Sequence, residues 1–218
     1  FEAHPKRFPR TPTPMLLDAF RLVAKTGLIA SVHNENQEVI AAMLERCAAL
    51  GMSGPATHAW TRPPINEALA MLEIYELGVT AGVHAHVVHC SLPRGIEICE
   101  SYKQQGHSVS VEVLLPYFFL TDEDVQKWGA FAKINPPIRT AAEREGLWQH
   151  FAAGHVDLIS TDHVAWSRER KNNPDMLKNN SGFPSLELLL PLMVTGCMER
   201  SVDLSLLASV VKESLAIG

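Results

Sequence analysis

Short apolar runs alternate with amphipathic helices along most of this chain of 218 residues. Four runs have the composition of buried strands, at about 28–33, 83–89, 108–115 and 156–161. Strands that alternate with helices build a parallel sheet rather than a helix bundle or a sandwich. We therefore predict an α/β fold with parallel strands. The helices are expected at about 15–26, 37–50, 65–77, 94–104 and 141–152.

The number of strands bears on which parallel architecture is present. A doubly wound sheet and a (β/α)8 barrel share this periodicity, but a whole barrel needs about 250 residues and eight strands. If the fold is a barrel, the chain carries half of it. The chain also opens on Phe1, without an initiator Met, and enters a Pro-rich stretch that ends at Pro14. We expect residues 1–218 to form one partial barrel domain whose N-terminal part is missing.

Composition limits the classes of partner and compartment. With 46% hydrophobic residues and a mean hydropathy of +0.01, the chain can fill a globular core. The formal net charge is -5 and the basic residues are scattered, so no nucleic-acid partner is expected. No apolar run reaches the roughly 18 residues of a membrane span. Four separated cysteines and an N-terminus unlike a signal peptide predict a reducing cytoplasm.

Three of the predicted strands end in a residue that can bind a metal. These residues are His33, His89 and Asp162. In a parallel barrel the strand ends open on one face, so side chains far apart in sequence can converge there. Imidazole and carboxylate are ordinary ligands of Zn²⁺ and related ions. A single histidine at a strand end is more often structural, but the three together predict a metal site.

Four motifs accompany these strand ends in a fixed order. They are Val-His-Asn-Glu-Asn at 32–36, Val-Val-His-Cys-Ser at 87–91, Lys-Ile-Asn-Pro-Pro-Ile-Arg at 133–139 and Thr-Asp-His at 161–163. Each resembles an element of hydantoinases, dihydropyrimidinases and allantoinases. The resemblance runs from about residue 6 to about residue 215. The chain is therefore similar to the cyclic amidohydrolases of the amidohydrolase superfamily.

This resemblance implies a distorted TIM-type (β/α)8 barrel, of which the chain would be the C-terminal half, about strands 5–8. It also implies two divalent metal ions, with zinc expected first and Mn, Fe or Co as alternatives. His33 and His89 would hold one metal and Asp162 the other, and Asp162 would also be the catalytic base. A His-x-His pair and a carboxylated lysine would complete the centre upstream of Phe1. We interpret the histidines at 84 and 86 as structural, because they lie in the same strand as His89.

The resemblance assigns substrate contacts to Asn135, Trp166, Ser181 and Gly182. Asn135 favours dihydroorotases, whereas Trp166 stands where those enzymes have a substrate-binding histidine and so favours a hydantoinase. The alternative for Trp166 is that it only packs against the following loop. Residues 180–187 resemble a loop whose backbone holds the ring amide. We predict that the polar stretch 168–181 is a solvated loop, with a lid over the site as the alternative.

The predicted function is hydrolysis of a C–N bond in a small cyclic amide, imide or ureide by metal-activated hydroxide. Dihydroorotase and allantoinase activities are the alternatives within this class. A non-catalytic dihydropyrimidinase-related scaffold is the alternative of another class. Family members are commonly dimers or tetramers, so a homodimer or homotetramer is expected. Arg62 and Glu67 are interpreted as scaffold, His163 as an orienting residue, and four further histidines as surface residues, at 58, 107, 150 and 155.

Overall fold

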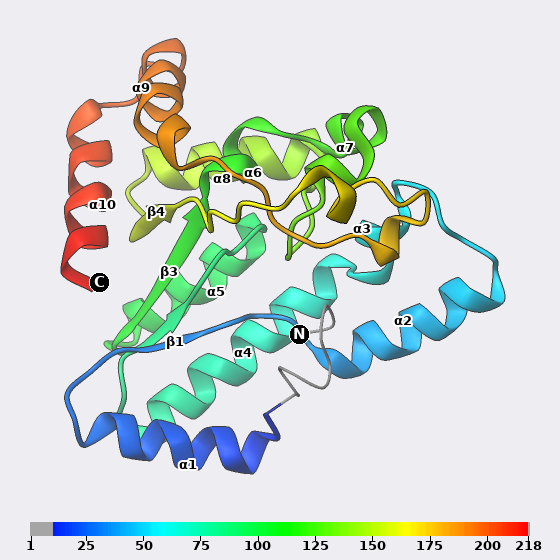
Figure 1. Ribbon diagram of the computed structural model, residues 1–218. Coiled ribbons are helices and arrows are strands. Elements are labelled where there is room, and N and C mark those ends of the chain that lie inside the picture. Colours follow the sequence, from blue (N-terminus) through cyan, green and yellow to red (C-terminus); the bar gives the residue numbers. More distant parts are fainter. Residues whose placement is uncertain (1–10, 218) are drawn as a thin grey trace.

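A single parallel sheet organises the protein. The structure, a computed structural model, describes the backbone of residues 11–217 and the side chains of residues 11–211. The strands are β1 (Ala30–Val32), β2 (Ala85–Val87), β3 (Val109–Leu114) and β4 (Leu158–Ser160). They lie side by side in sequence order and all pairs are parallel (Figure 1). The predicted α/β fold with parallel strands is confirmed.

One predicted helix precedes the first strand and four connect the strands, and all five are present. They are α1 (Thr13–Ala24), α2 (Gln37–Ala49), α4 (Pro64–Ala81), α5 (Pro93–Gln104) and α8 (Ala141–Ala152). The sequence analysis missed α3 (Thr57–Thr61), α6 (Leu115–Phe119), α7 (Asp122–Trp128), α9 (Leu189–Glu199) and α10 (Leu204–Ile217). Short 3₁₀ turns also escaped it: η1 (Gly129–Ala132), η2 (Arg168–Arg170), η3 (Met176–Lys178) and η4 (Leu186–Leu188).

Local signals explain where the long helices begin and end. Pro64 stands at the start of α4, where a missing backbone N–H costs nothing, and Gly82 ends this helix with a φ of 69°. At α8, the Thr140 side chain accepts from the Glu143 N–H while the Glu143 carboxylate accepts from the Thr140 N–H. This reciprocal cap satisfies backbone donors that the first turn leaves free.

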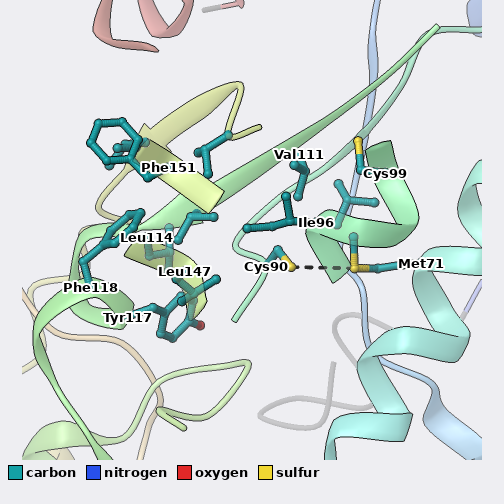
Figure 2. Close-up of a cluster of buried hydrophobic side chains, with 14 of the residues drawn as sticks. Met71, Cys90, Ile96, Cys99, Val111, Leu114, Tyr117, Phe118, Leu147 and Phe151 are labelled. Carbon is teal, nitrogen blue, oxygen red and sulfur yellow. Dashed lines mark hydrogen bonds between the residues drawn. The ribbon is translucent and has the colours of Figure 1, made fainter. Parts of the chain in front are cut away.

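The core lies between the sheet and the helices α4, α5 and α8. Side chains alternate along a strand, so Val109, Val111 and Val113 of β3 enter the core together. Figure 2 shows Val111 near Ile96 of α5, with aromatic and aliphatic side chains of α6 and α8 further along the sheet. The neighbouring positions of β3, Ser110 and Glu112, project to the opposite face. The two faces of the sheet therefore differ sharply in polarity.

Within the described residues, β1 and β4 each pair with one neighbouring strand, so the outer edge of each is free of sheet partners. None of the helices in the described part of the chain is long and apolar enough to cross a membrane.

Candidate functional site

The ends of β1 and β2 bring two predicted site residues into contact. Val32 and Val87 are paired in the sheet, and His33 and His89 follow them. His33 Nδ1 and His89 Nε2 are 2.8 Å apart, and the ring centroids are separated by 4.6 Å in an edge-on arrangement. Residues that lie 56 positions apart in sequence thus form one side-chain pair.

His89 and Asp162 both have backbones in the left-handed region. Their φ angles are 46° and 43°, an uncommon conformation for residues other than glycine. At His89 the backbone N–H donates to Glu112 Oε1 at 3.2 Å. Such conformations persist where surrounding contacts impose them, and they concentrate at functional sites.

His89 is held in its neutral form. Burial is the main cause that lowers its pKa well below the ordinary value, and the nearby His33 lowers it further. Its Nδ1 atom is buried and has no hydrogen-bond partner among the described residues. A neutral imidazole keeps a lone pair on one nitrogen, which is the state in which histidine binds metals.

Behind this pair, the Glu35 carboxylate joins His33 to a buried arginine. Glu35 Oε2 lies 3.0 Å from His33 Nε2, and Glu35 Oε1 lies 3.1 Å from Arg62 Nε. Burial alone would raise the pKa of Glu35, but the charges of Arg62 and His33 outweigh it and hold the pKa well below its usual range. Glu35 is therefore a fixed anion that orients the His33 ring.

His58 belongs to the same network, so its assignment to the surface was wrong. It is buried, with Nε2 2.9 Å from the Ile134 carbonyl oxygen and Nδ1 3.3 Å from Arg62 Nη1. Burial lowers its pKa, and the charge of Arg62 adds to this effect. His107, His150 and His155 are partly buried rather than fully exposed.

A second buried network is centred on Glu67 and agrees with its interpretation as a scaffold residue. Glu67 accepts from the Ser91 backbone N–H and hydroxyl, both at 2.6 Å, and from Asn34 Nδ2 at 3.0 Å. Arg139 donates to Glu67 Oε2 at 3.1 Å and to the Arg62 carbonyl at 2.6 Å. These bonds tie the segment after β2 to the start of α4 and to the Asn-Pro-Pro motif.

Asp162 stands at the end of β4, where it is partly accessible to solvent. Partial burial raises the pKa of Asp162, the charge of Glu112 raises it further, and His33 opposes the shift. Among the described residues, no three His, Cys, Asp or Glu side chains gather closely enough to hold a metal ion. The two histidines therefore meet without Asp162 in a common group, and the metal roles of the three residues stay a prediction.

The four predicted substrate residues lie together beside the Asn-Pro-Pro motif. The Ser181 hydroxyl donates to Asn135 Oδ1 at 3.0 Å, and Trp166 Nε1 donates to the Ser181 carbonyl at 2.8 Å. Gly182 has a φ of 95°, and a Cβ there would come within 3.0 Å of Val164. The one N–H of Trp166 serves Ser181, which favours the packing alternative, and its contact with a substrate stays a prediction.

The polar stretch 168–181 is solvated in part, as predicted, with residues 168–170, 172–174 and 178 exposed. Lys171, Met176 and Asn179 are buried within it, and Asn179 Nδ2 donates to the carbonyls of Asn173 and Asp175. His163 has the expected orienting role, because its Nδ1 accepts from the backbone N–H groups of residues 185 and 186. The segment is internally bonded and attached to the rest of the fold.

The sequence and the structure were compared with those of known proteins. No family model matches the chain. It is 29% identical over 203 residues to an allantoinase from Deinococcus radiodurans, covering 93% of this chain and 45% of the relative. It is 30% identical over 179 residues to a dihydroorotase from Halobacterium salinarum, covering 81% of this chain and 39% of the relative. The structure superposes on L-hydantoinase (dihydropyrimidinase) from Arthrobacter aurescens with a TM-score of 0.91 and 28% identity, over 94% of this chain and 46% of that one.

The chain is similar to cyclic amidohydrolases over most of its length. It spans about half the length, or less, of the relatives it matches. The cyclic amidohydrolase motifs at 32–36, 87–91, 133–139 and 161–163 all lie at or near the carboxyl ends of the strands or on the loop that faces them.

The sequence analysis missed the roles of three residues of this site. Glu112 is an acidic residue inside a predicted strand, where the alternation of β3 gives the only signal for it. Lys133 and Lys171 are buried, with 5% and 4% of their surface exposed. Lysine is among the residues least often buried, so the burial of Lys171, and of Lys133 at the start of the motif 133–139, carries no sequence signal.

Proposed function

We propose that the protein containing this chain hydrolyses a C–N bond in a cyclic amide, imide or ureide ring. The contact between His33 and His89 at the ends of adjacent strands carries this proposal, with Asp162 at the end of β4. The similarity to proteins named allantoinase, dihydroorotase and L-hydantoinase supports the same class of bond.

The two histidines fit a divalent metal as nitrogen donors. Two imidazole nitrogens on one tetrahedral zinc ion are about 3.3 Å apart, given bonds of about 2.0–2.1 Å. The observed 2.8 Å between His33 Nδ1 and His89 Nε2 is shorter than that separation, so the two rings would move slightly apart on holding one ion. When bound, divalent ions of this kind lower the pKa of water and polarise the amide carbonyl.

Asp162 is proposed as the proton shuttle. Its pKa is raised above the ordinary value by partial burial and by Glu112. A carboxylate beside an attacking water can act as a general base and then as a general acid. Asp162 would take a proton from this water and return it to the leaving nitrogen.

The ring is proposed to bind beside Asn135 and Ser181. A cavity of about 450 Å³ opens there, and its lining includes Asn135, Asn180, Ser181, Arg62 and Lys133. The amides of Asn135 and Asn180 and the Ser181 hydroxyl are polar groups that suit the carbonyl oxygens and N–H groups of an amide or ureide ring. Because the Trp166 N–H is occupied, ring specificity would rest on Asn135 and the 180–182 backbone.

We further propose that the fold is the C-terminal half of a (β/α)8 barrel, about strands 5–8. In the described part of the chain β1 and β4 are the outer strands of the sheet, which supports this proposal because natural proteins cover the edges of sheets. The remaining metal ligands, including the carboxylated lysine, would then come from the other half. The homodimer or homotetramer and the cytoplasmic location stay predictions.

The test is a substrate panel with the protein as the cell makes it. Hydantoin, dihydrouracil, allantoin and dihydroorotate are assayed for ring opening, first with the parent and then with Asp162→Asn. We expect turnover of at least one ring and a loss of about 1,000-fold or more in kcat for Asp162→Asn, the scale seen when a catalytic group is removed. Asp18→Asn, at an exposed position on α1, is the matched control and should keep full activity.

Two outcomes would contradict the proposal. Absence of turnover on all four rings, in protein loaded with Zn²⁺ or Mn²⁺, would favour the scaffold alternative. Activity of Asp162→Asn within a few-fold of the parent would show that Asp162 is not the proton shuttle.

A further inference from the structure

Lys171 is buried behind the substrate loop and contacts no carboxylate among residues 11–211. Lys171 follows η2, and its ammonium donates to the carbonyls of Lys133 at 3.0 Å, Asn180 at 3.1 Å and Gly182 at 2.8 Å. An ammonium has three N–H donors, and three carbonyls occupy them. Burial lowers the pKa of Lys171 to about 8, so the group still carries its proton at neutral pH.

A second buried lysine secures the same loop from the other side. Lys133 Nζ donates to the carbonyls of Leu177 at 3.1 Å and Asn179 at 2.5 Å. The carbonyl of Lys133 in turn accepts from Lys171 Nζ and from the Gly182 N–H, the latter at 2.9 Å. The backbone that leads into the Asn-Pro-Pro motif is thereby fastened to residues 177–182.

These bonds fix the direction of the peptide groups around Ser181. The carbonyls of Asn180 and Gly182 point to Lys171, and the carbonyl of Ser181 points to Trp166. In a trans peptide the N–H points opposite to the C=O. The Ser181 N–H is therefore turned away from Lys171, while the Ser181 hydroxyl reaches Asn135 beside the cavity.

We propose that Lys171 is a positioning residue for substrate binding, and this inference rests on the proposed function. Its ammonium holds the carbonyl groups of Asn180 and Gly182, the two residues on either side of Ser181, and so presents Ser181 and Asn135 to the amide ring. Lys171 does not contact the reacting atoms. Its loss should weaken ring binding much more than it slows the chemical step.

The test compares Lys171→Met with the parent in the protein as the cell makes it. Methionine has a similar length and no donor, so the three carbonyls lose their partner. For the best ring of the four-member panel, KM should rise about 10-fold or more while kcat stays within threefold. Hydrogen exchange at residues 180–183 should quicken by about 10-fold or more. Lys127→Met, at an exposed position on α7, carries the same charge change and should leave both measurements unchanged.

A milder variant covers the case in which Lys171→Met does not fold. Lys171→Gln keeps an N–H₂ donor without the charge, and KM should rise about threefold with kcat unchanged. A KM within 1.5-fold of the parent, with unchanged exchange, would overturn the proposal for either variant. A fall of kcat with unchanged KM would also overturn it, because that result indicates a role in the chemical step or in folding alone.

The two proposals fail separately. If the parent opens none of the four rings, the proposed function fails, and the exchange measurement then decides the role of Lys171 in the loop. Unchanged exchange at residues 180–183 in Lys171→Met would overturn the proposal in that case as well.

Discussion

On the helix-covered face of the sheet, Val109, Val111 and Val113 pack into the core, whereas on the opposite face Ser110 and Glu112 bond to histidines. Ser110 Oγ lies 2.7 Å from His84 Nε2 and 2.8 Å from His86 Nδ1. One strand thus serves two purposes through the alternation of its side chains. The apolar face supplies stability, and the polar face and strand ends position the proposed chemistry.

The largest effect on stability is expected for the buried ion pair between Glu67 and Arg139, which lies behind the polar strand ends. Replacing Glu67 by Gln would remove the charge that faces Arg139 and disturb the bonds to Ser91. An unpaired buried arginine is costly, so we expect a loss of about 3–5 kcal/mol in the free energy of unfolding. Urea denaturation measures this loss of free energy. Glu123→Gln, at an exposed position on α7, should change stability by less than about 0.5 kcal/mol, and equal losses in both variants would refute the role of this network.

The apolar face should show the next largest effect. Val111 is fully buried in the core, and Val111→Ala removes two methyl groups and leaves a small cavity. The expected loss is about 2–3 kcal/mol in the free energy of unfolding, with ring-opening activity kept in the folded protein. Urea denaturation and the substrate assay check these two outcomes together. A strong loss of kcat with little loss of stability would reverse the roles assigned to the two faces.

Acid should reduce the stability that the strand ends contribute and leave the contribution of the apolar face unchanged. The pKa of Glu35 is held well below its ordinary value of 4.5, so the unfolded state binds a proton more readily. The stabilisation by Glu35 is therefore complete above pH 4.5 and is lost as the pH falls below it, by up to about 1.4 kcal/mol per pH unit. Stability curves between pH 3 and 7 should be shallower for Glu35→Gln than for the parent and unchanged in slope for Val111→Ala. The account of Glu35 would be wrong if Glu35→Gln kept the parent slope.

The smallest effect is expected at the position next to Val111. Ser110→Ala removes the hydroxyl shared by His84 and His86, but His84 keeps its contact with Ser108. We expect a loss of about 1 kcal/mol in the free energy of unfolding, less than for Val111→Ala. The comparison is made by urea denaturation of the two neighbouring variants side by side. A larger loss for Ser110→Ala would mean that the polar face contributes more stability than the core face.

Much of the fold could be predicted from the sequence because its signals are local. The strand runs and the helices between them follow from periodicity, and α8 was predicted with its observed bounds. The missed elements have weaker signals. The apolar run through residue 115 was extended as strand, whereas α6 begins there, because short apolar segments suit a strand and a helix equally.

The site was predictable in part. The contact of His33 and His89 follows from strand ends that the sequence marks clearly. The burial of His58 and Lys171 could not be predicted, because each depends on backbone carbonyls from distant segments, Ile134 for His58 and Lys133 for Lys171. Such partners leave no residue-type pattern, since any residue has a backbone carbonyl.

The most direct test of the proposed site is metal analysis of the protein as the cell makes it. We predict bound divalent ions in the parent and at least a tenfold loss of metal affinity in His33→Ala and in His89→Ala, while His107→Ala, remote from the pair, keeps the parent value. Equal metal content and affinity in the parent and in both site variants would contradict the assignment of His33 and His89 as metal ligands.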